Sequence, residues 1–465
     1  MTRTRGTDDP RVAKLALDLG RRVGESKVID DPDLLVELSK DESHAAPAMP
    51  DLALRAADAD DVRAALELAE KHEVPAVARG GGTGKSGGAI PVRGGLVIDL
   101  RRLNRIAEID RENLLAVVEP GVITQALQVA VEAEGLFYPP DPNSLETCTL
   151  GGNAAHNAGG PRAFKYGVTR EYVLGARVAL MGGRAMRVGK RTVKGVAGYD
   201  LTALLVGSEG TLGVFTELTL RLVRNPPHLA TLLVRMPDEI AAGRAVARIV
   251  ADGLVPRVVE LMDRVAVETL RASGAGAIPE DTGALLLIEV DGLDDAGVER
   301  DSAHLAELSE AEGAVEVLMA RHGGERERLW AARRTLSDAI KKRARFKVAE
   351  DVAVPRGHAP RLLEGLRAIA ARHRVVVPTY GHAGDGNYHV NVLWDEEGRD
   401  VEPVLADIFA LALSLGGTIT GEHGVGLTKR AYLALEIEAV NLALQRELKR
   451  AFDPKGLLNP GKIFP

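Results

Sequence analysis

The sequence lacks the marks of several protein classes. Its 465 residues include a single cysteine, Cys148, which excludes an internal disulfide framework and fits a reducing compartment. No run approaches the about 18 apolar residues of a spanning helix, and no secretory signal is expected at the start. With 59 Lys and Arg against 66 Asp and Glu, no basic face for nucleic acid is expected. We therefore expect a cytoplasmic protein, or one held at the inner face of the membrane through a partner.

Aromatic residues are also scarce, at 3%, whereas glycine is abundant, with 50 residues. At this length two or three domains are expected, and a hydrophobic content of 45% is ordinary for a globular chain. The glycines are clustered, which marks places where the backbone approaches a ligand closely or takes positive φ.

Strand and helix patterns alternate up to the break at Asn225-Pro226-Pro227, which predicts an α/β domain preceded by a helical lead-in. The expected elements are a helix capped by aspartate at 60–72, strands at 96–100 and 114–121, a helix at 123–135 and a hairpin at 176–189. Strands and charged helices, including 325–345, then alternate over 228–375 and predict an α+β domain with an antiparallel sheet. A final segment contains a glycine turn and a helix at 432–452.

Two glycine-rich stretches near the C-terminus, GHAGDGNYHVN (381–391) and GEHGVG (421–426), carry candidate metal ligands. Imidazole and carboxylate groups together suit a borderline divalent ion such as Zn²⁺, with Mn or Fe as alternatives. A further histidine beside such an ion has the pKa range of a general base. The alternative is that these are turn glycines with incidental surface histidines. We favour the metal site, with the ligands His382, His389 and Glu422 and with His423 as the base.

A third cluster, RGGGTGKSGG (79–88), invites two motif assignments that fail. A Walker A loop needs a glycine at position 79, which is Arg79. A Rossmann fingerprint must open a helix, but here a proline, further glycines and a strand follow. What remains is a run of backbone N–H groups that can form an anion nest, to which Lys85 and Ser86 could add donors. This indicates phosphate binding rather than a flexible surface loop.

Several motifs together resemble the flavin domain of the vanillyl-alcohol oxidase/p-cresol methylhydroxylase class. They are ARGGGTGKSGGAIP, PPDPNSLETCTLGGNAAHNAGGPRAFKYG, VKGVAGYDL and GSEGTLGV. The HAGDGNYH and GEHGVG pair, with NPGKIF at the end, is similar to the FAD-linked 2-hydroxy-acid dehydrogenase branch. That branch includes D-lactate dehydrogenases, the glycolate oxidase catalytic subunit and D-2-hydroxyglutarate dehydrogenase.

The resemblance implies an α+β chain with a two-lobed FAD-binding domain and a ferredoxin-like α+β substrate domain. The expected parts are a lead-in (1–46), the FAD domain (47–226), the substrate or cap domain (227–410) and a C-terminal segment packing back on the FAD domain (411–465). FAD is expected to be non-covalent, because 79–88 lacks a histidine and His156 is expected to pack or to bond to backbone. The FAD residues it implies are Arg79, Gly80, Gly81, Gly82, Thr83, Gly84, Gly87, Gly88, Pro140, Asp141, Thr147, Thr149, Gly151, Gly152, Asn153, Asn157, Gly159, Gly160, Glu209, Gly213, Val214 and Asn459, with Lys462 beside the last.

For the reaction, a divalent ion would lower the pKa of the substrate hydroxyl and His423 would take its proton, while a hydride passes to the flavin. Asn391 is expected to bond the substrate. Arg333, three residues after Trp330, is expected to clamp its carboxylate bidentately, against the alternative of a solvated helix face. In the hydroxyglutarate relatives a basic residue precedes the DxxxP strand. Here that position is Ala349, with Lys347 only nearby, which favours lactate or glycolate over a dicarboxylic acid.

The rival functions are an O₂-using oxidase of the same fold, a non-catalytic FAD subunit of an electron-transfer complex, and a nucleoside triphosphate binder. The failed Walker spacing excludes the last, and the intact histidine motifs count against the non-catalytic subunit. The expected partners are the small 2-hydroxy acid and an electron acceptor such as a quinone, an electron-transfer flavoprotein, a cytochrome or an Fe–S subunit. A homodimer is compatible with the sequence.

Overall fold

The computed structural model describes residues 9–274, 278–320 and 322–465, which form two compact units. Unit 1 comprises Met1–Gly159, Val168–Asn225 and His423–Pro465, and unit 2 comprises Gly160–Gly167 and Pro226–Glu422. The chain thus leaves unit 1 after Asn225 and returns to it at the Glu422–His423 peptide bond. The four-part division expected from the sequence stays a prediction.

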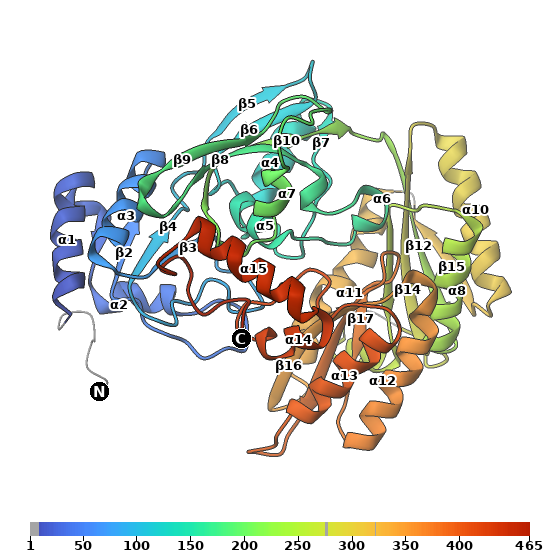
Figure 1. Ribbon diagram of the computed structural model, residues 1–465. Helices are drawn as coiled ribbons and strands as arrows, with labels where there is room; N and C mark the ends of the chain where they lie inside the picture. The colour runs from blue at the N-terminus through green and yellow to red at the C-terminus, as the bar shows by residue number, and fades with distance from the viewer. Residues whose placement is uncertain (1–8, 275–277, 321) are drawn as a thin grey trace. The chain divides into compact units, whose positions relative to one another are not determined.

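Unit 1 contains a mostly parallel sheet in the order β1-β2-β4-β3, in which β1 is Val28–Ile29. Figure 1 labels β2, β4 and β3. The strands β2 (Leu52–Arg55) and β3 (Ala76–Arg79) both run parallel to β4 (Leu96–Asp99). Parallel neighbours need a crossover, and α3 (Ala59–His72) provides it between β2 and β3. Because β3 ends at Arg79, the buried strand leads directly into the first glycine loop.

The second sheet of unit 1 is antiparallel, in the order β5-β6-β10-β8-β9. The predicted hairpin at 176–189 is confirmed: its strands pair in register, and Gly182 and Gly183 take φ of 77° and 73° at the turn. Helix α5, whose N-cap is Thr149, contains Gly151 and Gly152. It carries the second glycine-rich segment of unit 1 (147–157); the first is the loop at 79–88. The elements not yet bounded are β5 (Ile106–Asp110), β6 (Leu115–Val118), α4 (Thr124–Glu132), β7 (Leu136–Phe137), α5 (Leu150–His156), β8 (Val173–Ala179), β9 (Ala185–Gly189), α7 (Leu201–Leu205), β10 (Val214–Arg221) and β11 (Val223–Arg224).

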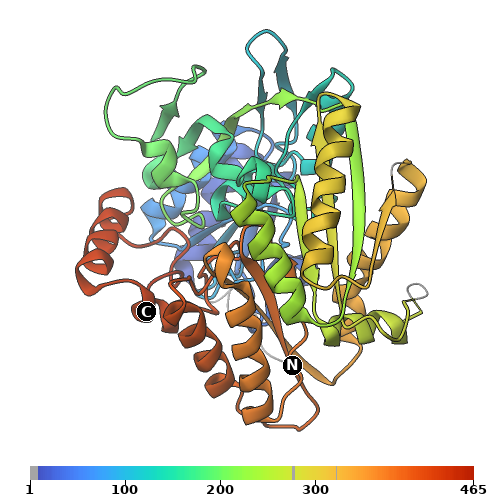
Figure 2. The same ribbon diagram turned by 90° about the vertical axis from the view of Figure 1, so that its right-hand side faces the viewer.

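Unit 2 is built on an antiparallel seven-stranded sheet, which confirms the predicted α+β domain. Helices α8 and α10 lie side by side over one face of this sheet (Figure 2). Helices α9 and α11 pack on the face that carries Leu285 and Leu287. The strands, in sheet order, are β15 (Glu316–Ala320), β12 (His228–Met236), β14 (Ala284–Gly292), β13 (Val258–Met262), β17 (Thr379–His382), β18 (Asn387–Trp394) and β16 (Phe346–Ala353). The helices are α6 (Ala163–Tyr166), α8 (Glu239–Asp252), α9 (Arg264–Ala272), α10 (Asp295–Ala311), α11 (Gly323–Lys341), α12 (Ala359–His373) and α13 (Glu402–Ser414).

Two predicted helical segments differ from the structure. The lead-in does contain α1 (Pro10–Val23) and α2 (Pro32–Leu35), but between them β1 (Val28–Ile29) pairs antiparallel with β2; residues 1–8 lie outside the described part. The helix predicted at 432–452 is two helices, α14 (Leu433–Glu436) and α15 (Ala439–Phe452), because Ile437 and Glu438 are extended. None of the helices in the described ranges has the length and apolar character needed to cross a bilayer.

Candidate active site

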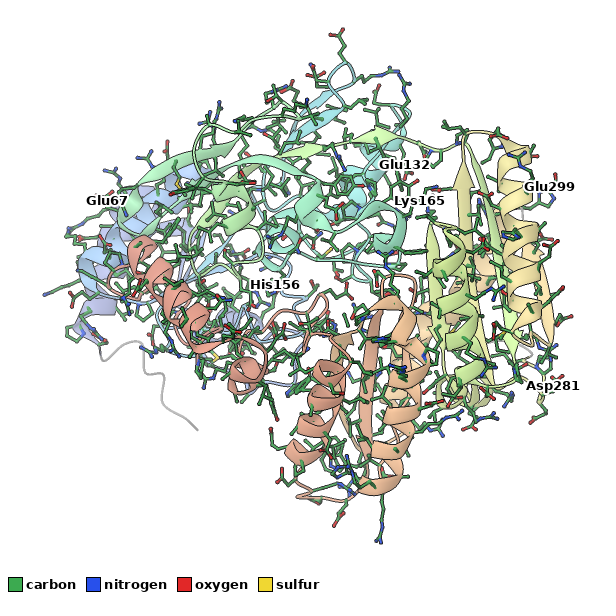
Figure 3. All side chains as sticks on the ribbon, turned by 45° about the vertical axis from the view of Figure 1, so that its right-hand side comes forward. Glu67, Glu132, His156, Lys165, Asp281 and Glu299 are labelled. Carbon is green, nitrogen blue, oxygen red and sulfur yellow. The ribbon has the colours of Figure 1, made fainter. Side chains whose placement is uncertain are left out.

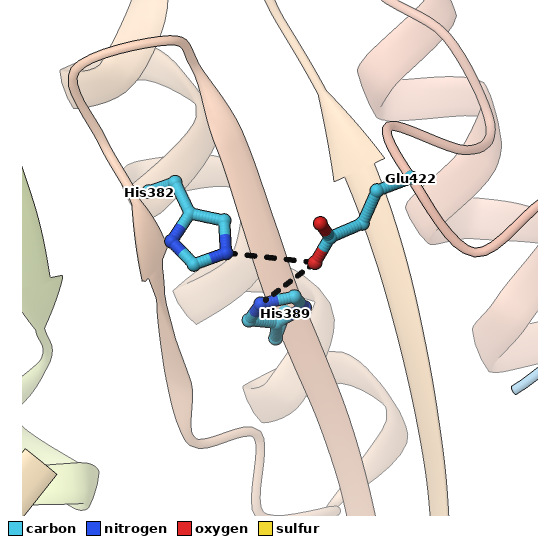
Figure 4. A group of neighbouring side chains, drawn as sticks. All are labelled: His382, His389 and Glu422. Atoms are coloured by element: carbon cyan, nitrogen blue, oxygen red, sulfur yellow. Dashed lines mark ion pairs between the residues drawn. The ribbon is translucent and has the colours of Figure 1, made fainter. Parts of the chain in front are cut away.

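Two strands and one loop of unit 2 bring the three predicted metal ligands together. His382 ends β17, His389 lies in β18, and Glu422 lies in the loop after α13. The Nε2 atoms of His382 and His389 are 3.5 and 3.6 Å from Glu422 Oε1. Figure 4 marks these two ion pairs with dashed lines. Ligand atoms around a tetrahedral zinc ion are roughly 3.4 Å apart, because each bond is about 2.1 Å long. The two distances to Glu422 are close to this value, and all three ligand atoms lie within 4.8 Å of one another, so the cluster could hold a small divalent ion.

Glu260 in β13, a residue that the sequence analysis missed, sets the orientation of His382. The two residues are directly opposite in the β13–β17 ladder, and His382 Nδ1 is hydrogen-bonded to Glu260 Oε1. The other nitrogen, Nε2, is buried without a hydrogen-bond partner among the described residues. A carboxylate on the far nitrogen of a ligand histidine fixes its tautomer and raises its basicity. Nε2 of His382 therefore faces the other two candidate ligand atoms without a hydrogen bond of its own to any described residue, and this fits a bound cation.

The charges of Glu260, Arg333 and His382 compensate one another in the interior of unit 2. Burial raises the pKa of Glu260, but Arg333 and His382 outweigh burial and lower that pKa to about 2. Burial lowers the pKa of His382, but the Glu260 and Glu422 carboxylates hold that pKa well above its ordinary value. A divalent ion entering the cluster therefore competes with a proton on His382.

The two other predicted catalytic residues of unit 2 lie on the same side of the sheet. Arg333, in α11, is buried rather than on a solvated helix face, and its Nε donates to Glu260 Oε2 at 2.6 Å. Its guanidinium stacks on the Tyr380 ring, 4.6 Å from the ring centroid, and the hydrogen bond to Glu260 uses Nε rather than the two terminal nitrogens that could bind a carboxylate. Asn391 is fully buried, with Nδ2 donating to the backbone of Pro378 and His389 and with Oδ1 unpaired.

In unit 1 the two glycine-rich segments meet. A Cβ on Gly80 would lie 2.2 Å from Thr149 Oγ1, and one on Gly81 would lie 2.3 Å from the carbonyl oxygen of Thr147. Only glycine permits this approach. A cavity lies between the segments, and the predicted residues that line it are Arg79, Gly80, Gly88, Thr149, Gly151, Gly152, Glu209, Gly213 and Val214.

The other predicted FAD residues lie outside the cavity lining. Asn153 bonds Thr124, Asn157 accepts from Arg170 N, and Asn459 donates to the carbonyl oxygens of Gly88 and Glu209. Gly160 belongs to unit 2. Lys85 is paired with exposed Glu42. The other predicted FAD residues that do not line the cavity are Gly81, Gly82, Thr83, Gly84, Gly87, Pro140, Asp141, Thr147 and Gly159.

Three buried polar atoms near this cavity lack a hydrogen-bond partner among the described residues: Arg79 Nε, Ser86 Oγ and His156 Nδ1. Such atoms are rare in folded proteins, and a polar ligand or an ordered water would satisfy them. His156, labelled in Figure 3, lines the cavity at the end of α5, and its ring packs against Gly88, which is one of the two roles expected for it. The glycines that precede His156 in the sequence are a signal from which its place at the cavity could have been predicted. The residues present thus fit a long polar cofactor such as FAD.

The segment that follows His423 packs within unit 1. The Glu209 carboxylate accepts from Val425 N at 2.8 Å and from Gly426 N at 2.7 Å. A Cβ on Gly426 would lie 2.1 Å from the carbonyl oxygen of Ser86, in the first glycine loop. The side chain of Glu209 therefore holds this turn, a role beyond the cofactor contact predicted for its backbone.

Comparisons with known proteins agree with this geometry. Residues 50–189 match the family described as FAD binding domain, and residues 225–463 match FAD linked oxidases, C-terminal domain. The chain is 42% identical to Glycolate oxidase subunit GlcD of Bacillus subtilis, over 90% of this chain and 89% of that protein. It is 34% identical to D-lactate dehydrogenase of Anaerostipes hadrus, over 90% of each. The crystal structure of p-cresol methylhydroxylase has a TM-score of 0.80 at 16% identity, covering 97% of this chain and 96% of that one, which shows the fold alone.

Replacing Glu260 by glutamine should weaken binding of Zn²⁺ to the chelator-treated protein by roughly 10–100-fold, because His382 loses the charge that orients it. Isothermal titration of the protein with Zn²⁺ measures this. The matched control is Glu289→Gln, since Glu289 is a buried carboxylate of the same sheet that bonds Thr231 and Trp330. Equal Zn²⁺ affinity for Glu260→Gln and wild type would contradict the prediction.

Replacing Asn459 by alanine should lower FAD affinity. The change leaves the carbonyl oxygens of Gly88 and Glu209 without their buried donor, at a cost of about 1–3 kcal/mol, and so loosens the first glycine loop. Flavin fluorescence released on dilution measures the loss. Asn441→Ala, in exposed α15, is the control and should retain the cofactor as wild type does; retention by Asn459→Ala as well would refute this role.

Proposed function

Because the chain belongs to the family of FAD-linked oxidases, we propose that it is a flavoprotein dehydrogenase that converts a short 2-hydroxy acid to the 2-oxo acid. The chain is an FAD-linked oxidoreductase, and two relatives are named for glycolate oxidation and for D-lactate dehydrogenation. We favour D-lactate or glycolate as the substrate. Non-covalent FAD and Zn²⁺, with Mn or Fe as alternatives, are part of the proposal.

The observation that carries the proposal is the cluster of His382, His389 and Glu422, followed at the next residue by His423. Three protein ligands leave coordination positions open for a substrate, which is typical of catalytic rather than structural sites. A divalent ion held there would supply Lewis-acid chemistry that lowers the pKa of a substrate hydroxyl. His423 is then the base that takes the hydroxyl proton.

The remaining residues bind and orient the acid. The terminal nitrogens of Arg333 match a carboxylate bidentately, while Glu260 and the Tyr380 ring hold the guanidinium in place. The unpaired Oδ1 of Asn391 can accept a substrate O–H. FAD in the glycine cradle would accept the hydride. These groups handle the carboxylate, the hydroxyl proton and the substrate orientation.

The small-acid preference rests on Ala349. This residue lies directly opposite Asn391 in the β16–β18 ladder and brings no charge for a second carboxylate. Lys347, two positions earlier, lies on the same face of β16 by strand alternation, and D-2-hydroxyglutarate stays the alternative substrate. The electron acceptor is proposed to be a quinone, an electron-transfer flavoprotein, a cytochrome or an Fe–S subunit.

Anaerobic mixing with a panel of D- and L-2-hydroxy acids should bleach the flavin with D-lactate or glycolate and less with D-2-hydroxyglutarate. Removal of the metal by a chelator should suppress the bleaching, and Zn²⁺ or Mn²⁺ should restore it. Absorbance near the flavin maximum gives the readout. If no acid bleaches the metal-replete enzyme, a non-catalytic FAD subunit is the better description. Fast peroxide formation in air, relative to dye reduction, would instead identify an oxidase.

Replacing His423 by alanine should slow flavin reduction by about 10²–10⁴-fold, because proton abstraction loses its base, while FAD stays bound. Stopped-flow reduction under anaerobic conditions measures the rate. His304→Ala, which alters an exposed histidine paired with Asp252, should reduce at the wild-type rate. Fast reduction by His423→Ala would remove His423 as the base.

A further inference from the structure

Asp351 is a fully buried carboxylate in β16 that is bonded to the loop carrying Glu422. Its Oδ2 accepts from Gly421 N and from Glu422 N, both at 2.7 Å, and its Oδ1 accepts from Thr420 Oγ1 at 3.0 Å. Hydrogen bonds to an ionised acceptor are shorter and about twice as strong as neutral ones. The backbone amide of one metal ligand is therefore fixed by a charge inside the sheet.

The same side chain is related to a second ligand. In the β16–β18 ladder, Asp351 pairs directly with His389, so its side chain and that of His389 point to the same face of the sheet. The two backbones are held in register over eight residue pairs. Asp351 thus connects the strand that carries His389 to the loop that carries Glu422.

The loop reaches Asp351 because it extends the sheet. β16 is the outermost strand, and Thr418 forms an antiparallel bridge with Ala353 beyond it, with Thr418 N donating to Ala353 O at 2.8 Å. The main-chain pairing is limited to this isolated bridge. Beyond it, the Asp351 carboxylate accepts from the Thr420 hydroxyl and from the amides of Gly421 and Glu422.

The backbone of the turn is closely packed at Gly421. A Cβ there would lie 2.3 Å from Asn387 Oδ1, so the backbone passes directly against the end of β18. The loop packs against Asn387 and is hydrogen-bonded to the Asp351 carboxylate. Glu422 extends from this fixed backbone to the two histidines.

We infer that Asp351 is a positioning residue for the metal centre, which holds the Glu422 carboxylate where it completes the site with His382 and His389. The inference rests on the proposed function, since it presupposes a divalent ion at this cluster. Asp351 does not touch the ion. It acts through the backbone of Glu422, and its loss should loosen one of three ligands while leaving both histidines in place.

The test is metal binding by the full-length, FAD-loaded protein after chelation, with Zn²⁺ and Co²⁺ as probes. Asp351→Asn should weaken Zn²⁺ binding by roughly 10–100-fold and change the visible absorption of bound Co²⁺, which reports coordination geometry. The matched control is Asp238→Asn, because Asp238 also accepts two backbone N–H bonds, at 2.8 Å each, from Ile240 and Ala241. The control should bind both ions as wild type does, whatever its melting temperature.

A double-substitution cycle separates positioning from general destabilisation. In a Glu422→Ala background, Asp351→Asn should cause little further loss of Zn²⁺ affinity, because the group that it positions is already gone. An additive loss would overturn the assignment to Glu422, and wild-type affinity for Asp351→Asn alone would overturn the role of Asp351 altogether. If the wild-type protein itself binds no divalent ion, the proposed metal centre fails, and the inference with it.

Discussion

The buried carboxylate of Glu260 is the interaction on which the candidate site of unit 2 depends. It has no exposed surface, and it faces Arg333 on one side and His382 on the other. A buried charge without partners would be strongly destabilising, so these two cationic groups and the carboxylate must fold together. The arrangement thereby fixes a proposed substrate clamp and a metal ligand with one residue. The sheet supplies the register, and α11 supplies the arginine.

In unit 1, by contrast, the candidate cofactor site depends on the close approach of backbone segments and not on a buried charge. Gly80 lies against the Thr149 side chain and Gly81 against the carbonyl oxygen of Thr147, and the tail returns Asn459 to bond two carbonyl oxygens of the cradle. Lys462, whose pKa burial lowers to about 8, donates to Ile90 O beside it. Segments that are far apart in the sequence thus provide one lining. A cofactor held there would contact the first glycine loop and the second one, while Asn459 supports the lining through the carbonyl oxygens of Gly88 and Glu209.

The sequence was most informative where chemistry requires particular residue types. The metal ligands were predicted from imidazole and carboxylate groups among glycines, and the structure brings these three residues together. The hairpin at 176–189 and the antiparallel sheet of unit 2 were also predicted from local patterns. Glu260 and Asp351 could not be predicted in this way, because each acts through a partner more than 60 residues distant that only strand register reveals. The break between α14 and α15 at Ile437 could not be predicted either, because no glycine or proline marks it in the sequence.

The bridge between Thr418 and Ala353 has a consequence for solubility. An outermost strand presents unpaired N–H and C=O groups, which can recruit strands from other molecules. The segment that delivers Glu422 covers part of this edge on β16, where three consecutive residues, Glu350, Asp351 and Val352, are buried. Ligand placement and protection against aggregation are thus served by the same few residues. Selection for a soluble chain and selection for an intact site would act on this segment together.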